Sequence, residues 1–227
     1  MRIVSWNLAG GNKREPVEGI EADIALFQER RRADAHQHEL WSGKLHFKGL
    51  SVRSHGLYSL EAMRCPGELP RYFVPMQVSG LERFQLIGVW AQNDDPDRYV
   101  RGIVRAVSLC RDQILAQPTV IAGDFNANAC WNDEHPADRN FSALARQLDG
   151  LGLVSAYHQF SGEAFGEETR PTFYLHRFPH RPYHIDYCFI PKSWLPRLRS
   201  VTVGTYSEWT KWSDHVPVTV ELDDPIG

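Results

Sequence analysis

The chain alternates short apolar runs with polar turn residues, and most of the runs are rich in β-branched or aromatic side chains. Runs of this kind that end at Gly, Pro, Asn or Asp are typical of β-strands. The pattern predicts strands at residues 2–7, 22–28, 56–63, 71–78, 83–90, 119–121, 154–158, 172–176, 184–190, 201–206 and 216–222.

Longer segments place apolar residues at helical spacing. The first, 97–116, follows Asp95 and Pro96, which are favoured at the N-cap and the first helical position. The second is 141–151, and one or two helical turns are predicted within 12–19. Strands outnumber helices, and the helices lie between groups of strands. The pattern therefore predicts an α/β (α+β) fold with two mostly antiparallel sheets packed face to face and helices on both outer sides.

The 227-residue chain is long enough to bury a substantial core, and it contains no linker, repeat or low-complexity tract. We therefore expect one domain over residues 1–227. The N-terminal stretch lacks the pattern of an export signal, and no later run approaches a membrane-spanning length. Together with the wide spacing of the cysteines, this predicts a cytoplasmic protein with reduced thiols at Cys65, Cys110, Cys130 and Cys188.

The charges are nearly balanced, with 25 Lys and Arg against 28 Asp and Glu and a net charge of −3. Such a protein has no overall attraction for polyanions, so contact with nucleic acid would depend on a local patch. Nothing in the sequence indicates an obligate protein partner.

Acidic and amide side chains stand where several predicted strands end. Asn7 closes the first strand, Glu29 follows the second, and Asp124 and Asn126 follow the run 119–121. An ionised Asp only accepts hydrogen bonds, whereas Asn also donates, so Asp124 and Asn126 together suit holding a water against an anionic oxygen. All of these residue types except Glu are also ordinary turn residues. Glu29 suits Mg²⁺ or Mn²⁺ as a hard oxygen ligand, and it equally suits ion pairing with the arginines that follow it.

Five short segments, in this order, resemble the DNase I-like endonuclease/exonuclease/phosphatase superfamily. They are SWNLAG (5–10), ALFQE (25–29), AGDFNA (122–127), HIDYCFI (184–190) and SDHVPV (213–218). The resemblance extends over nearly the whole chain. It implies a four-layer α/β sandwich and an enzyme that cleaves phosphoester bonds with a divalent metal, usually Mg²⁺ or Mn²⁺.

The resemblance also implies a metal site. Carried over by motif, Glu29 is similar to the principal metal ligand, with Asn7 beside it and Asp214 as a further candidate. Ala9 stands where several nuclease relatives place an Asp, so the motif gives little support to a second metal.

The remaining motif residues resemble the catalytic groups of the superfamily. Asp124 is similar to the residue that orients or deprotonates the attacking water, or that protonates the leaving oxygen, and Asn126 to the amide that contacts both that aspartate and the phosphoryl group. His215 is similar to the phosphate-contacting histidine, which Asp186 orients and keeps protonated. Outside such a motif, a histidine of this kind is more often a hydrogen-bonded structural residue.

Candidate substrate contacts follow from position and residue type. Many relatives carry a Tyr or His where this chain has Trp90, which can donate a hydrogen bond or stack but cannot transfer a proton. Aromatic and basic residues also gather in the loops around 131 and 173–184, where some are equally suited to the core. The substrate-binding candidates are Trp90, Asn93, Trp131, Tyr174 and His184.

These observations leave three hypotheses in order. The first is a metal-dependent nuclease acting on DNA or RNA. The second is a phosphodiesterase or phosphatase acting on a small or lipid-linked substrate, such as a phosphoinositide or sphingomyelin. The third is a non-catalytic binding protein with the same fold, which the complete set of acidic residues and His215 disfavours.

Overall fold

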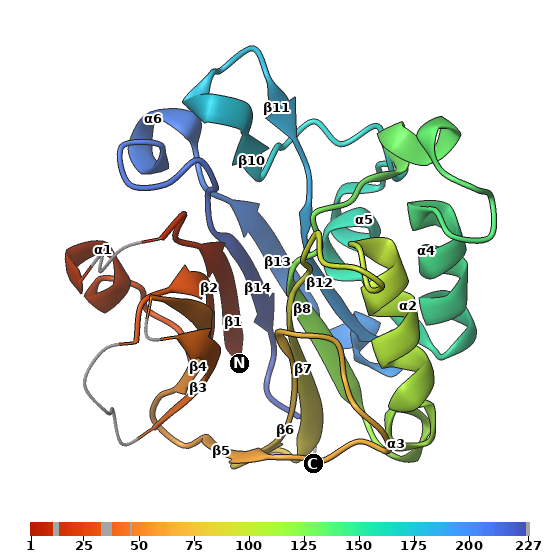
Figure 1. Ribbon diagram of the computed structural model, residues 1–227. Helices are drawn as coiled ribbons and strands as arrows, with labels where there is room; N and C mark the ends of the chain where they lie inside the picture. Colours follow the sequence, from red (N-terminus) through yellow and green to blue (C-terminus); the bar gives the residue numbers. More distant parts are fainter. Residues whose placement is uncertain (11–13, 33–37, 46, 226–227) are drawn as a thin grey trace.

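Two six-stranded β-sheets face each other, and helices cover their outer faces (Figure 1). The structure is a computed structural model that describes residues 1–10, 14–32, 38–45 and 47–225. The predicted sandwich of two sheets between helices is therefore confirmed. In the described part of the chain, no helix is long and apolar enough to cross a membrane.

The first sheet carries both ends of the chain. In spatial order it contains β13 (Leu198–Val203), β14 (Val218–Leu222), β1 (Arg2–Asn7), β2 (Ile24–Arg30), β4 (Lys48–Ser54) and β3 (Glu39–Leu45). Only β1 and β2 run parallel, and every other neighbouring pair is antiparallel. The parallel pair places the C-terminal ends of β1 and β2 at the same edge of the sandwich.

The second sheet forms in the middle of the chain. In spatial order it contains β5 (Ser59–Ala62), β6 (Phe73–Ser79), β7 (Phe84–Trp90), β8 (Thr119–Asp124), β12 (Asp186–Pro191) and β9 (Leu153–Ser155). Here β7 and β8 are parallel, and β12 is antiparallel to β8 with Asp186 opposite Asp124. The end of β8 therefore lies beside the start of β12.

The helices and short elements complete the layers. The outer face of the second sheet is covered by α2 (Val100–Leu109), α3 (Arg111–Ala116) and α4 (Phe141–Gly150), and α5 (Ala156–Ser161) contacts β12 and β13. Beside the first sheet lie α1 (Arg14–Glu18) and α6 (Tyr206–Trp209). The loops contain η1 (Ala129–Glu134), η2 (Leu175–Arg177), η3 (Lys192–Arg197) and the small hairpin β10 (Phe173–Tyr174) and β11 (Pro182–Tyr183).

The strand period of two decides which side chains enter the space between the sheets. In β8, Val120 and Ala122 belong to the core between the sheets, whereas Ile121 packs toward the helices. In β12, Cys188 and Ile190 likewise face the inter-sheet core. Asp124 lies two residues after Ala122 on β8, and Asp186 lies two residues before Cys188 on β12. The same alternation therefore directs both side chains into the inter-sheet space. The carboxylates thus stand at the end of the main core.

Glycine is required at position 123, next to this end of β8. Gly123 has φ 145°, and a Cβ atom there would lie 1.9 Å from the Val89 carbonyl oxygen. Only glycine allows β7 and β8 to approach this closely immediately before Asp124.

Most predicted strands are confirmed, but several local predictions are wrong. The region 97–116 contains two helices, α2 and α3, with a break at Cys110, and α2 begins after Tyr99, so Asp95 is not its N-cap. Residues 154–158 are divided between β9 and α5. The hairpin of β3 and β4 was not predicted, because its strands contain Gly, Ser and Lys and lack a continuous β-branched run.

The expectation of four reduced thiols is also wrong. Cys65 and Cys110 form a disulfide whose Cα atoms lie 5.4 Å apart, and Cys130 and Cys188 are free. The two bonded residues are separated by 45 positions, so their proximity follows from the packing of the loop before β6 against α2 and α3.

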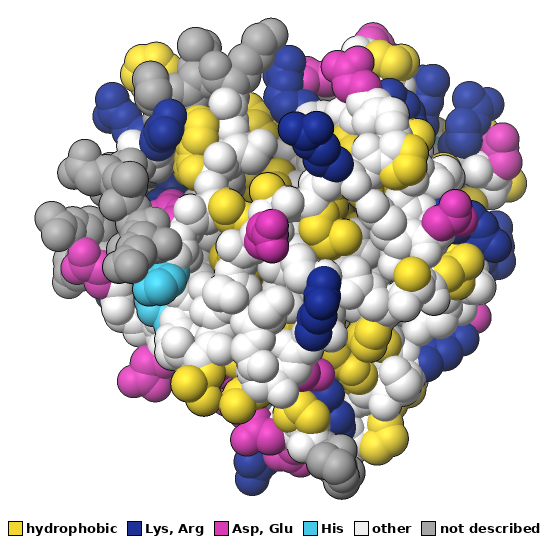
Figure 2. Space-filling model, turned by 90° about the horizontal axis from the view of Figure 1, so that it is seen from below, with side chains coloured by type: hydrophobic (Ala, Val, Ile, Leu, Met, Phe, Trp, Pro, Cys, Tyr) yellow, Lys and Arg dark blue, Asp and Glu magenta, His cyan; other side chains and the backbone are white. Residues whose placement is uncertain are grey.

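Charged side chains are interspersed on the end of the sandwich opposite the C-terminal ends of β1 and β8. Figure 2 shows Lys and Arg side chains there among Asp and Glu, with single hydrophobic side chains between them.

Candidate active site

Three polar side chains from different strands meet where the two sheets end. The Asn7 amide nitrogen on β1 donates a 2.8 Å hydrogen bond to Asp124 Oδ2 on β8, which joins the first sheet to the second. Asp186 on β12 stands opposite Asp124 in the antiparallel register. Asn7, Asp124 and Asp186 are at most 1% exposed. The structure therefore brings these three predicted residues together in a buried cluster.

The turn after β8 fixes the orientation of Asp124. Asn126 has φ 48°, a left-handed conformation that Asn adopts more readily than most residues. Its backbone N–H donates to Asp124 Oδ1 at 2.8 Å, and its side-chain amide donates to Asp124 Oδ2 at 3.0 Å and to the Ala91 carbonyl at 3.0 Å. Both oxygens of Asp124 are thus held by donors, and both N–H bonds of the Asn126 amide are engaged.

His215, from the segment before β14, contacts the same cluster. Its Nδ1 is 2.9 Å from Asp186 Oδ2, and its Nε2 is 4.0 Å from Asp124 Oδ2. The Ser213 hydroxyl donates to the Asn7 carbonyl at 2.7 Å and accepts the His215 backbone N–H at 3.1 Å. The imidazole is consequently placed between two carboxylates by a segment that is itself anchored to the end of β1.

Asp186 is incompletely hydrogen bonded. The Thr172 hydroxyl accepts the backbone N–H of Asp186 at 3.0 Å and so fixes the start of β12. The Oδ2 atom of Asp186 bonds His215, but its buried Oδ1 atom has no hydrogen-bond partner in the described structure. A buried carboxylate oxygen without a donor is costly, so Oδ1 can still accept a hydrogen bond.

The cluster shifts the protonation of two of its members. Burial disfavours the Asp124 carboxylate and the nearby Asp186 charge disfavours it further, which raises the pKa of Asp124 to about 7. Burial alone would lower the pKa of His215, but the charge and the hydrogen bond of Asp186 outweigh it and raise that pKa to about 9. At neutral pH the cluster therefore holds an imidazolium beside a carboxylate that is poised to exchange a proton.

Glu29 lies at the end of β2, next to the end of β1, because Asn7 pairs with Gln28 in the parallel register. The pairing of β2 with β4 is interrupted by a β-bulge between Phe27 and Arg30, and Glu29 has φ 54°. Such bulges redirect side chains near functional sites. The Lys48 ammonium contacts Glu29 Oε2, so this carboxylate already attracts a positive charge.

Asp214 completes the predicted set. It is half-buried between Ser213 and His215, and its carbonyl accepts the Tyr174 backbone N–H at 2.7 Å. Carboxylate and amide oxygens are the donors that Mg²⁺ and Mn²⁺ prefer, and Glu29, Asn7 and Asp214 supply them from adjacent strand ends and the adjoining loop. These donor types fit a hard divalent cation.

A model of the Endonuclease/Exonuclease/phosphatase family matches residues 4–215. The chain belongs to this family. Its members are endonucleases, exonucleases and phosphatases by description, which supports hydrolysis of phosphoester bonds as the activity of the chain. No curated protein matches the sequence significantly.

Solved structures of the same fold are similar over almost the full length of this family member. A 3′ phosphatase from Neisseria bound to a product DNA hairpin has a TM-score of 0.75 and 21% identity, and the match covers 98% of this chain and 99% of that one. An AP endonuclease from Archaeoglobus fulgidus has a TM-score of 0.73 and 15% identity, with coverage of 98% and 99%. At such identities these structures establish the shared fold.

The predicted substrate contacts of this family member fall into two groups. Asn93 is exposed and Trp131 is half-buried, and both line a cavity beside Asn126. In contrast, Trp90 is 6% exposed and stacks on Tyr72 with ring centroids 4.5 Å apart. This burial places the indole in the core between the sheets.

The other two candidates are buried as well. Tyr174 packs edge-on against Tyr206 at 4.8 Å, and burial raises its pKa. His184 Nδ1 is hydrogen bonded to the Arg170 carbonyl at 2.7 Å, and burial lowers its pKa. Both side chains support the loop that carries Thr172, so we assign them a packing role.

Sequence reasoning missed three side chains that support the cluster: Lys48, Thr172 and Ser213. Lys48 was hidden because its strand was not predicted, and its contact with Glu29 depends on the pairing of β2 with β4. Thr172 precedes a predicted strand, but its bond to the Asp186 amide is fixed only by the path of the loop. Ser213 belongs to the SDH motif, and its place in that motif is the feature of the sequence that could have indicated it.

Proposed function

We propose that this protein is a divalent-metal-dependent phosphodiester hydrolase that acts as a nuclease on DNA or RNA. The observation that carries the proposal is the buried arrangement of Asp124, His215 and Asp186 at the junction of the two sheets. The two similar structures described above are an AP endonuclease and a 3′ phosphatase bound to DNA, which supports nucleic acid as the substrate.

Glu29, Asn7 and Asp214 are the residues that would hold Mg²⁺ or Mn²⁺. When bound, such an ion neutralises charge on the non-bridging phosphate oxygens. Asp124, Asp186 and His215 also offer atoms within 4.8 Å of one another. We assign the cation to Glu29 nevertheless, because His215 Nδ1 is already bonded to Asp186 and its raised pKa disfavours the neutral imidazole that a metal needs.

Asp124 is proposed to orient the attacking water and to accept its proton. Its carboxylate is held by Asn7 and Asn126, and a pKa raised to about 7 makes it an effective base near neutral pH. Asn126 acts by positioning Asp124, since both N–H bonds of its amide are already used by Asp124 and Ala91. The aspartate therefore retains a fixed orientation during the reaction.

His215 is proposed to bind a non-bridging phosphate oxygen through Nε2–H. Asp186 holds the other ring nitrogen and keeps the ring protonated, so the imidazolium can stabilise the additional negative charge of the transition state. As the bond from water to phosphorus forms, the bond to the leaving oxygen breaks, and that oxygen is protonated by solvent. The chain thus combines a positioned base with a positioned cation whose Nε2 lies 4.0 Å from Asp124 Oδ2.

A substrate panel tests the proposal. Plasmid DNA, single-stranded DNA and single-stranded RNA would be incubated with the protein in Mg²⁺, in Mn²⁺ and in EDTA, beside inositol phosphates and bis-p-nitrophenyl phosphate. We expect turnover of at least one nucleic acid, its loss in EDTA and its recovery when Mg²⁺ or Mn²⁺ is restored. Full activity in EDTA would contradict the metal requirement, and turnover of inositol phosphates alone would favour the small-substrate class.

A further inference from the structure

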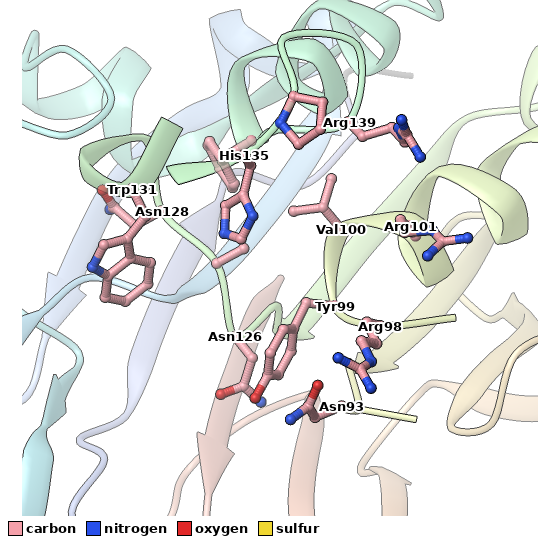
Figure 3. Close-up of a pocket in the computed structure, with 13 residues that line it drawn as sticks. Asn93, Arg98, Tyr99, Val100, Arg101, Asn126, Asn128, Trp131, His135 and Arg139 are labelled. Carbon is pink, nitrogen blue, oxygen red and sulfur yellow. The ribbon is translucent and has the colours of Figure 1, made fainter. Parts of the chain in front are cut away.

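A cavity of ≈ 460 Å³ opens beside the turn that carries Asn126 (Figure 3). It lies between the start of α2 and the segment that contains η1. Its volume is within the range of about 300–1,000 Å³ that is typical of small-molecule sites. Its walls include Asn93, Tyr99, Arg101, Asn126 and Trp131.

The walls of the cavity are rich in aromatic side chains. Tyr99 and Trp131 are half-buried, so each has part of its ring in contact with the cavity, while Phe141 is buried beneath them. Figure 3 shows Tyr99 next to Asn126, with Trp131 on another side of the cavity. Tyr183 supports Trp131 from behind, with ring centroids 4.9 Å apart. Flat aromatic surfaces on the walls of a cavity suit a planar aromatic ligand.

The amide groups at the cavity differ in what they can still bind. Asn128 is saturated, because its amide nitrogen donates to Glu168 and His184 and its oxygen accepts the Cys130 N–H at 2.8 Å. Asn93 is exposed and has no side-chain hydrogen bond within the described residues. Asn126 links the cavity directly to Asp124. A ligand in the cavity would therefore adjoin the proposed reaction centre.

Positive charge borders the cavity, and no acidic residue is among those that line it. Arg98 and Arg139 each have an acidic neighbour, at 2.7 Å and 3.4 Å, whereas Arg101 has no ionic partner in the part of the chain that the structure describes. The three guanidinium groups lie on the side of the cavity away from Trp131 (Figure 3). Guanidinium groups next to an aromatic cavity match a phosphate attached to an aromatic base.

We propose that this cavity binds the base of an unpaired nucleotide next to the phosphoester that is hydrolysed. The proposal rests on the proposed function and specifies its substrate as a nucleic acid strand with a single-stranded or frayed segment. The base stacks on Trp131 and Tyr99, and Arg101 contacts a neighbouring phosphate. A base that is paired within a duplex cannot enter, because its ring faces are covered by the adjacent bases.

Binding in EDTA tests the cavity independently of catalysis. Single-stranded oligonucleotides with 2-aminopurine at successive positions would be titrated with wild-type protein, Trp131→Ala, Trp131→Phe and Arg101→Ala. Arg111→Ala, the same substitution at an exposed position on α3, is the matched control, and circular dichroism verifies folding.

At one 2-aminopurine position we expect fluorescence quenching in the wild type. Trp131→Ala should weaken binding on the order of tenfold and remove the quenching, and Trp131→Phe should restore most of the affinity. Arg101→Ala should weaken binding at all positions. It should also reduce the slope of the logarithm of the binding constant against the logarithm of the salt concentration by about one. The Arg111→Ala control should bind like the wild type.

Turnover then separates this proposal from the proposed function. In Mg²⁺, replacing the base at the quenched position by an abasic analogue should lower wild-type kcat/KM on the order of tenfold and leave that of Trp131→Ala unchanged. Hydrolysis that is insensitive to both changes would overturn the cavity proposal and leave the nuclease proposal standing. If binding depends on Trp131 but no strand is hydrolysed, the nuclease proposal is overturned and base binding in the cavity stands.

A lipid-linked phosphate is the competing occupant. Vesicles that contain phosphoinositides would be tested with the same variants. Trp131-dependent vesicle binding, combined with no effect of Trp131→Ala on oligonucleotides, would overturn the nucleotide proposal.

Discussion

Two buried pairs of a histidine and a carboxylate lie in this protein, and they have different surroundings. In the proposed active site, His215 Nδ1 is 2.9 Å from Asp186 Oδ2. On the other side of β12, His158 Nε2 is 3.1 Å from Glu168 Oε1. All four side chains are at most 6% exposed, so burial alone does not distinguish the pairs.

The pair of His158 and Glu168 is fully satisfied. His158 Nδ1 lies 2.8 Å from the Ser155 hydroxyl, and the Asn128 amide nitrogen lies 3.1 Å from each oxygen of Glu168. Burial alone would raise the pKa of Glu168, but hydrogen bonds from His158, Asn128 and backbone amides lower it to about 2. Serine, histidine and glutamate resemble a catalytic triad here, yet the group is buried and acts as a structural anchor for the loop before Thr172.

The pair of His215 and Asp186 has an additional charge and an unused atom. Asp124 stands within 4.0 Å of His215, and Asp186 Oδ1 has no partner in the described structure. The comparison teaches that the same two side-chain types become an anchor when every polar atom is paired. They become a candidate reaction centre when a second carboxylate, Asp124, approaches the imidazole, and when burial and the Asp186 charge raise the pKa of Asp124 to about 7.

The largest expected effect is on turnover at the incompletely paired site. His215→Gln keeps a hydrogen bond to Asp186 but removes the positively charged imidazolium that is proposed to contact the phosphate. We expect kcat/KM on single-stranded DNA to fall by a factor on the order of 10² or more. Steady-state kinetics on protein whose folding has been verified by circular dichroism measures this change, and a variant with near-normal turnover would remove His215 from the mechanism.

The second-largest expected effect is on the free energy of unfolding, at the pair of His158 and Glu168. Glu168→Gln leaves the shape of the side chain but removes the charge that accepts bonds from His158 and Asn128. We expect the free energy of unfolding at neutral pH to fall by about 2 kcal/mol. Urea denaturation measures the loss, and the turnover per folded molecule should fall far less than in His215→Gln. Equal losses of turnover in the two variants would erase the distinction between the pairs.

The pH dependence of activity follows from the two shifted groups. Asp124 must be ionised to accept a proton, so kcat/KM should rise as the pH passes about 7, and a bound cation would move this limb to lower pH. His215 must be protonated, so kcat/KM should fall as the pH passes about 9. Asp186→Asn should shift the alkaline limb to lower pH, because the histidine loses the carboxylate that raises its pKa. A rate that keeps rising above pH 9 would contradict a catalytic imidazolium.

The smallest expected effect is in the acid stability of the anchor. The folded-state pKa of Glu168, about 2, lies below its ordinary value of 4.5, so the folded protein binds fewer protons at this group. Its contribution to stability is complete above about 4.5 and is lost as the pH falls toward 2. The difference in unfolding free energy between wild type and Glu168→Gln should therefore shrink from pH 6 to pH 3, and a constant difference would count against the ionic anchor.

Strand periodicity, turn residues and the family resemblance together predict much of this site. Asn7 and Asp124 are directed between the sheets by the alternation of β1 and β8, and the SDH and IDY motifs indicate His215 with Asp186. The sandwich follows from the order of strands and helices. The strand ends and the layers depend on local sequence, whereas the pairing of His215 with Asp186 was implied by the family resemblance.

Contacts between distant segments could not be predicted in the same way. The bond from Lys48 to Glu29 depends on a bulge and on a hairpin with weak strand propensity. The disulfide of Cys65 and Cys110 depends on how a loop packs against a helix end. The burial of Trp90 against Tyr72 depends on tertiary packing, which local residue type does not reveal.

The central claim is that separate strand ends build one phosphoester-hydrolysing centre around Asp124. The most direct measurement is the rate of hydrolysis of single-stranded DNA in Mg²⁺ by Asp124→Asn compared with wild type, with the thermal unfolding midpoint of both proteins recorded. We predict a loss of rate on the order of 10² or more in a variant that is still folded at the assay temperature. The midpoint should fall, because the new amide cannot accept all three hydrogen bonds that Asn7 and Asn126 donate to the carboxylate. A rate close to that of the wild type in the folded variant would contradict the claim.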